Sequence, residues 1–140
     1  MLKHISILIT LCFISCSSKI DKEDLKNLNG YWEIEKVTFK DGTSKEYKMS
    51  TTLDYIHVID TIGYRKKVQP KFNGTYETSN DAEAFSITKE NVTLFLNYSS
   101  DEISKRKEKL VTLNENTFTV INEEEIMYTY KKFTPINSTK

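Results

Sequence analysis

The stretch LNGYWEIEKVTF, residues 28–39, indicates how this chain folds. Trp32 and Ile34 fall at alternate positions, which is the period of a strand with one buried face. Val37 and Phe39 continue the alternation with the opposite parity. Because a shift of one residue within a strand is what a β-bulge produces, the stretch predicts a bulged strand.

Outward from this stretch, the chain continues as short strand-like segments separated by turns. The cleanest alternation of apolar and polar residues runs from Val92 to Tyr98, and turn signals such as Asp41-Gly42 lie between segments. Strands are expected near residues 31–39, 55–59, 72–76, 85–87, 92–98, 110–113, 117–120 and 126–130. Segments spaced by roughly 8 to 12 residues predict an all-β antiparallel barrel or sandwich of about eight or nine strands.

Two segments also fit helices. Residues 24–28 fit one helical turn that would cover one end of the fold. Residues 100–109 fit either a helix with a thin apolar stripe or a long polar hairpin, and the pattern leaves both open.

Leu28-Asn29-Gly30-Tyr31-Trp32 resembles the Gly-x-Trp opening strand of lipocalins, and more closely that of small lipocalin-like lipoproteins of Bacteroidetes. The resemblance implies an up-and-down barrel. In it, Gly30 lets the chain enter tightly, and Trp32 fills the closed end with its indole N–H bonded to backbone. In typical lipocalins an Arg near the end of the last strand packs over this tryptophan. Here only Lys131 and Lys132 stand nearby, so the resemblance implies the fold rather than a particular ligand.

The first residues resemble a bacterial lipoprotein signal. An apolar run at residues 5–14 follows a basic start and precedes Ser15 and Cys16, and residues 13–16 resemble a lipobox. A run of about ten residues is too short for a membrane-spanning helix, which needs about 20, so it is interpreted as a removed export signal. We therefore expect an exported protein anchored in the membrane by acylated Cys16. An ordinary secretory signal cut elsewhere, or a short N-terminal anchor, is the alternative.

These patterns divide the chain into a signal peptide, a lipidated tether, a lipocalin-like barrel and a C-terminal tail, at residues 1–15, 16–28, 29–135 and 136–140. The expected location is the outer membrane, on its periplasmic face or at the cell surface. Lys22-Glu23-Asp24 resembles a surface-export signal of Bacteroidetes lipoproteins.

Composition argues against several classes of function. With 20 basic and 20 acidic residues and no clustered basic face, nucleic-acid binding is not expected. Beyond the signal, His57 is the only histidine and Cys16 the only cysteine, so neither a metal site nor a cofactor is expected. The nucleophile-elbow motif is also missing from the sequence, and we predict no catalytic residues and no enzyme activity.

Apolar residues on alternating faces of several strands are candidates to line a ligand cavity. They are Ile56, Val58, Tyr76, Phe85, Leu94, Leu96, Tyr128 and Tyr130. Asp60-Thr61-Ile62 resembles a Bacteroidetes O-glycosylation site, which makes Thr61 a candidate for modification; a plain turn is the alternative.

Two functions remain open at this stage. In the first, a monomeric barrel binds a small hydrophobic or amphipathic ligand. In the second, a filled barrel is a protein-interaction module, such as an envelope inhibitor or immunity lipoprotein. A connected apolar cavity of about 300 Å³ or more with an open mouth favours the first, and a packed interior favours the second.

Overall fold

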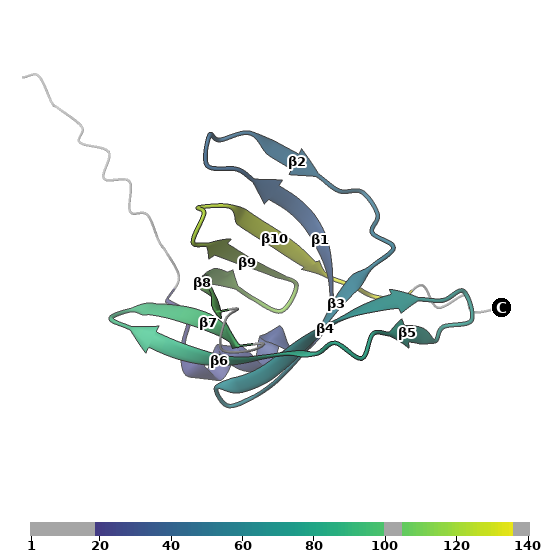
Figure 1. Cartoon of the computed structure of the whole chain (residues 1–140), viewed down its shortest axis with the longest axis horizontal. Coiled ribbons are helices and arrows are strands. Elements are labelled where there is room, and N and C mark those ends of the chain that lie inside the picture. Colours follow the sequence, from purple (N-terminus) through teal and green to yellow (C-terminus); the bar gives the residue numbers. More distant parts are fainter. Residues whose placement is uncertain (1–18, 100–104, 136–140) are drawn as a thin grey trace, which may run out of the picture.

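The computed structural model describes residues 19–99 and 105–135 of the chain (Figure 1). These residues form one short 3-10 helix and ten strands. In chain order they are η1 (Lys22–Leu28), β1 (Gly30–Thr38), β2 (Ser44–Glu46), β3 (Leu53–Ile59), β4 (Ile62–Pro70), β5 (Tyr76–Thr78), β6 (Glu83–Glu90), β7 (Thr93–Ser99), β8 (Lys105–Leu113), β9 (Thr117–Asn122) and β10 (Met127–Lys132).

The strands close into an antiparallel up-and-down barrel. Its eight wall strands follow the order β1-β3-β4-β6-β7-β8-β9-β10, and β10 pairs back to β1. The short strands β2 and β5 are additions that pair with β1 and β4. Figure 1 shows β2 beyond β1 and β5 extending beside β4. The predicted fold class, an all-β antiparallel barrel, is confirmed.

β1 carries the bulge that its sequence predicts. Ile34 pairs with Tyr130 and Lys36 pairs with Thr129, so Glu35 is the extra residue. Beyond the bulge, Val37 is buried and lies opposite Tyr128. The bulge therefore keeps apolar side chains on the inner face of β1 along its whole length.

η1 covers one end of the barrel, which we call the closed end. Leu25 and Leu28 are buried in the core, as the expected helical turn requires. The Asn29 side chain fixes the helix to β3, accepting from the Val58 amide at 2.6 Å and donating to the Val58 carbonyl at 3.3 Å. Residues 22–28, assigned to the tether by sequence, thus pack on the barrel. Across the described ranges, no helix is both long and apolar enough to cross a bilayer.

One expectation from the sequence needs correction, and one alternative that it left open is narrowed. A strand expected at residues 72–76 is instead mostly the turn between β4 and β5, and the Phe72 side chain is fully exposed. The strand in this region is β4, whose run of basic residues hides its alternation. Of the ambiguous stretch 100–109, residues 105–109 belong to β8, and residues 100–104 lie outside the described ranges.

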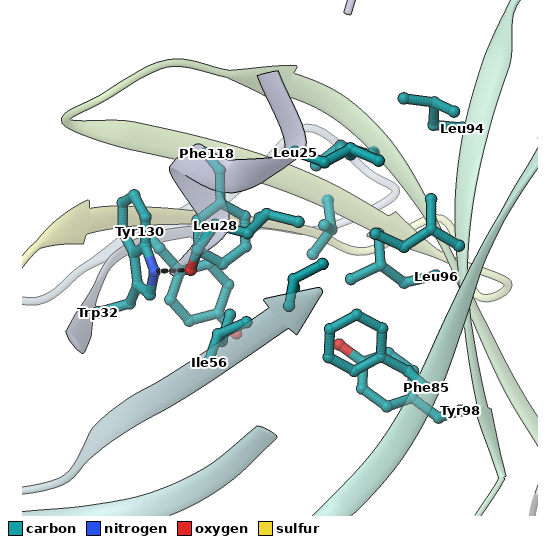
Figure 2. Close-up of a cluster of buried hydrophobic side chains, with 14 residues drawn as sticks. Leu25, Leu28, Trp32, Ile56, Phe85, Leu94, Leu96, Tyr98, Phe118 and Tyr130 are labelled. Carbon is teal, nitrogen blue, oxygen red and sulfur yellow. Dashed lines mark hydrogen bonds between the residues drawn. The ribbon is translucent and has the colours of Figure 1, made fainter. Parts of the chain in front are cut away.

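One contiguous apolar cluster fills the half of the barrel next to the closed end (Figure 2). Trp32 and Phe118 pack edge to face with ring centroids 4.7 Å apart, and Phe118 stacks on Tyr130 at 4.6 Å. Both Trp32 and Phe118 are completely buried. Burial of apolar surface on this scale is the main stabilising contribution for a domain of this size.

Candidate ligand site at the open end of the barrel

The predicted cavity-lining residues do not line a common cavity. Six of them belong to the apolar cluster and pack against one another, and Tyr128 packs at its edge. The six are Ile56, Val58, Phe85, Leu94, Leu96 and Tyr130. Tyr76 lies apart, stacked on Tyr31 with ring centroids 4.3 Å apart. Because Tyr31 alternates with inward-facing Trp32, the Tyr76 ring lies on the outer face of the barrel.

Trp32 and Lys132 complete the closed end. The indole N–H of Trp32 donates to the Leu28 carbonyl at 2.8 Å (Figure 2). The Lys132 Nζ atom lies 4.1 Å from the Trp32 ring centroid and donates to the Asn29 carbonyl at 2.6 Å. Burial lowers the pKa of Lys132. Lys132 therefore lies over the Trp32 ring and is held there by the backbone that precedes β1.

Gly30 is required for this arrangement. Its φ of +126° is rarely adopted by other residues, and an added Cβ atom would lie 3.1 Å from the Lys132 Nζ atom. The Gly-x-Trp motif is thus explained by contacts at the closed end.

Beyond the apolar cluster, toward the opposite end, lies a buried polar layer of Asp54, Arg65, Tyr98, Glu108 and Tyr130. The Arg65 guanidinium is its centre, donating to the Asp54 carboxylate at 3.0 Å and to the hydroxyls of Tyr130 at 2.7 Å and Tyr98 at 3.2 Å. The Glu108 carboxylate lies 3.8 Å from Arg65 Nη1. Arg65 thereby joins β3, β4, β7, β8 and β10 across the lumen.

The charges in this layer stabilise one another. Burial opposes the charged form of Arg65, but Tyr98, Tyr130 and Asp54 outweigh it, and the pKa of Arg65 is raised well above its ordinary value. Burial also raises the pKa of Asp54, yet the charges of Arg65 and Lys67 outweigh that effect and leave this pKa lowered. Burial raises the pKa of Tyr98 to about 12. At neutral pH the layer therefore holds a guanidinium, a carboxylate and a neutral phenol.

At the end opposite η1, charged side chains meet solvent at one wall of the lumen. Lys67 pairs with Asp54 across strands, Glu83 pairs with Arg65, and Arg106 pairs with Tyr98. Because directly paired residues share a face of the sheet, all three charged side chains lie on the inner face. Lys67 Nζ lies 2.7 Å from the Asp54 carboxylate, and Arg106 Nη2 lies 3.2 Å from that of Glu83. All three are partly or largely exposed, in contrast to the buried layer beneath them.

The opposite wall is apolar and aromatic. Ile34 pairs with Tyr130, and Tyr128 pairs with Val37, so these side chains also face inward from β1 and β10. Ile34 and Tyr128 are only half-buried although they face the lumen. We call this open end the mouth and define it by Ile34, Lys67, Glu83, Arg106 and Tyr128. It is an amphipathic surface above a polar floor.

Two half-open depressions lie near these features. One of about 380 Å³ lies largely on the outer face of the barrel, where its lining includes the outward-facing Ser86, Asn97, Ser99, Lys105 and Lys107 in addition to Tyr98 and Arg106. The other, of about 410 Å³, lies at the closed end between Lys19-Ile20 and the adjacent parts of β7 and β8. Of the eight predicted lining residues, only Leu94 contributes to either depression.

One polar atom of the buried layer stands out. The Glu108 Oε2 atom is inaccessible to solvent and has no hydrogen-bond partner among the described residues. Its nearest cation is Arg65 at 3.8 Å, beyond hydrogen-bond range. Glu108 Oε2 is thus a buried hydrogen-bond acceptor of the polar layer that is left unpaired within the described part of the chain.

The other predicted residues lie elsewhere. Cys16 falls outside the described residues. Thr61 lies in the two-residue turn between β3 and β4, where Asp60 has a φ of 55°. His57 faces outward, with its ring 5.6 Å from that of Tyr64. Within residues 19–99 and 105–135, no group of three or more His, Cys, Asp or Glu side chains is arranged to bind a metal ion.

Sequence reasoning missed the buried polar layer. Arg65 lies in the run Arg65-Lys66-Lys67, and Glu108 lies between Lys107 and Lys109, so both look like surface charges. The available signal was parity, because Arg65 is two residues from Gly63 and Glu108 is two residues from Leu110, and residues two apart in a strand share a face.

Comparison with known proteins finds similarity among solved structures. No protein-family model and no curated protein matches the chain. Among solved structures, it is similar to a lipocalin-like protein from Bacteroides uniformis, with 12% identity over 76% of this chain and 99% of the other and a TM-score of 0.47. It is also similar to apocrustacyanin C1, with 8% identity over 88% of this chain and 74% of the other and a TM-score of 0.45.

Proposed function

We propose that this chain is an outer-membrane lipoprotein, anchored by acylated Cys16, whose barrel binds a small amphipathic molecule at its mouth. The observation that supports binding is the division of the mouth into two walls. Ile34 and Tyr128 offer an apolar surface, and Lys67, Glu83 and Arg106 offer charged groups opposite. A ligand with an apolar part and a polar group matches both.

The packing of the interior limits how far such a ligand can enter the barrel. The apolar cluster occupies the closed half, and Trp32, Ile56 and Leu96 in it are completely buried. A long hydrocarbon chain entering there would have to displace close-packed side chains, which is costly. The proposed ligand therefore lies shallow, above Arg65 and its partners.

Native mass spectrometry of the protein isolated from a bacterial envelope tests ligand binding directly. A retained small molecule would identify the ligand class. In parallel, titration with an anilinonaphthalene sulfonate probe measures the probe affinity of Tyr128→Ala and Arg106→Gln and compares it with that of Tyr64→Ala. Tyr64 is a half-buried tyrosine of β4 on the outer face, so it is a matched control. We expect at least a tenfold loss of affinity for the two mouth variants only. Equal affinity in all three variants, with no molecule retained, would refute the ligand site.

A second candidate function is protein interaction. Three exposed apolar side chains, Phe39, Met49 and Phe72, lie in the loops β1–β2, β2–β3 and β4–β5, which belong to the mouth end. Together with the filled closed half, they favour a barrel that presents loops to a partner protein. The triple variant Phe39→Ser, Met49→Ser, Phe72→Ser should then abolish crosslinking to a partner in intact cells while leaving probe binding unchanged.

The anchor has its own test. Metabolic labelling with a fatty-acid probe should mark the wild-type protein and leave Cys16→Ala unlabelled. Equal labelling of both proteins would contradict acylation at this residue. Protease treatment of intact cells then separates the cell surface from the periplasmic face.

A further inference from the structure

We infer that the closed end of the barrel rests on the lipid surface, with the apolar tips of two hairpins in the interfacial layer, so that the mouth faces the aqueous phase. The inference builds on the acylation of Cys16 in the proposed function. The occupant of this surface is the bilayer in which the acyl chains lie.

The length of the tether limits how far the barrel lies from the membrane. Lys19 follows Cys16 by three residues, so a fully extended chain spans only about 10 Å between them. Ile20 already packs against the apolar cluster, and η1 begins two residues later. The chain therefore enters the fold at the closed end, within reach of the lipid headgroups, whose layer is roughly 5 to 8 Å thick on each side.

Exposed apolar side chains lie at the same end. Ile59 and Ile62 are a directly paired couple beside the β3–β4 turn, and they are 66% and 69% exposed. Val92, in the β6–β7 turn, is 75% exposed. Because the strands are antiparallel, both turns fall at the end where β1 begins and η1 packs, as Figure 1 shows.

The surroundings of Val92 also suit a lipid surface. Val92 lines the half-open groove at the closed end together with Ile20, Lys19 and Lys109. Lys19 Nζ lies 3.8 Å from the Asp21 carboxylate, and both side chains are largely exposed, so this ion pair contributes little. Lysines beside apolar tips are positioned to contact anionic headgroups, while the apolar side chains enter the interface.

This orientation has a consequence for ligand access. The mouth lies at the opposite end of the barrel from η1, so it opens away from the membrane. An amphipathic ligand would then arrive from the aqueous side and not by lateral entry from the lipid.

Spin-label depth measurements on the full acylated protein test the orientation. The protein is reconstituted into vesicles of phosphatidylethanolamine and phosphatidylglycerol, carrying a label at Ile62→Cys or, as control, at Met49→Cys. Met49 is 88% exposed and lies in the β2–β3 loop at the mouth end. Once Cys16 is acylated, its sulfur is not free to react, so each label is unique.

We expect the Ile62 label to gain accessibility to oxygen and lose accessibility to a water-soluble nickel chelate by at least threefold upon reconstitution. The Met49 label should change little. A Met49 label that is the more deeply immersed, or two labels that both stay in water, would overturn the orientation. Vesicle flotation distinguishes a wrong orientation from loss of the anchor, because an unacylated protein would not float. A protein that floats with both labels in water refutes the orientation alone. Probe binding at the mouth is measured independently.

Discussion

At the scale of single residues, Trp32 combines several contacts that stabilise the closed end. It is completely buried, donates to Leu28, packs against Phe118 and lies beneath Lys132. Trp32→Ala should therefore lower the free energy of unfolding by about 3 to 5 kcal/mol. Trp32→Phe keeps an aromatic ring but leaves the Leu28 carbonyl unpaired, so we expect a smaller loss of about 1 to 3 kcal/mol. Urea unfolding followed by circular dichroism measures both, and a loss under about 1 kcal/mol for Trp32→Ala would show a peripheral role.

Arg65 is the second residue on which the interior depends. Its removal leaves the buried carboxylates of Asp54 and Glu108 without their shared buried cation, although Lys67 stays beside Asp54 and Arg106 stays 3.7 Å from the Glu108 carboxylate. Removing one partner of a buried ion pair costs about 3 to 5 kcal/mol, and we expect a loss of that order for Arg65→Met. Lys66→Met is the matched control, since Lys66 lies on the outer face, and it should change stability by no more than about 0.5 kcal/mol. Similar urea midpoints for the two variants would contradict the central role of Arg65.

At the scale of elements, the hairpin of β3 and β4 depends on the absence of a side chain at Gly63. A Cβ atom there would lie 2.5 Å from the His57 carbonyl oxygen and 2.7 Å from the Phe85 ring. Gly63→Ala should thus force β3 and β6 apart and cost about 1 to 3 kcal/mol, as overpacking does. The neighbouring exposed variant Ile62→Ala should change stability by only about 0.5 kcal/mol. Thermal unfolding of both proteins checks this, and equal melting temperatures would refute it.

Elements also show where the sequence was informative. The bulge in β1 was predictable because the parity of the apolar residues changes between Ile34 and Val37, and local alternation records such a change. β4 was missed because Arg65 occupies an inward position where alternation calls for an apolar residue. Its partners Tyr98 and Tyr130 lie 33 and 65 residues further along the chain. Strand parity could place Arg65 on the inner face, but contacts between such distant strands leave no local pattern, so the partners of Arg65 in the polar floor could not be predicted.

At the scale of the whole molecule, the layered interior makes stability depend on pH at the acidic end. The pKa of Asp54 is lower in the fold than its ordinary value, because Arg65 and Lys67 outweigh the effect of burial. A carboxyl group whose pKa is lowered in the fold stabilises the folded state at pH values above its ordinary pKa near 4. This stabilisation is lost as the pH falls toward the lowered pKa. We expect the urea midpoint of the wild type to decrease below pH 4. Asp54→Asn should be less stable at pH 7 but show a flatter acid limb, and parallel acid limbs would contradict the assignment.

At alkaline pH, the stability of the fold should decrease as the pH rises, because of Tyr98. Burial raises its pKa to about 12, so the folded state holds this proton while the unfolded state releases it near pH 10. A raised pKa contributes stability that is fully present below the unfolded value and is lost as the pH rises to the folded one. The difference of about two pKa units corresponds to a loss of roughly 3 kcal/mol as the pH rises from 10 to 12. Urea unfolding at intervals of pH, combined with the ultraviolet absorbance of tyrosinate, measures both the slope and the delayed ionisation. Tyr98→Phe lacks this proton, so it should start less stable at pH 9 and lose stability more gently, and an unchanged slope would show that Tyr98 is not the group responsible.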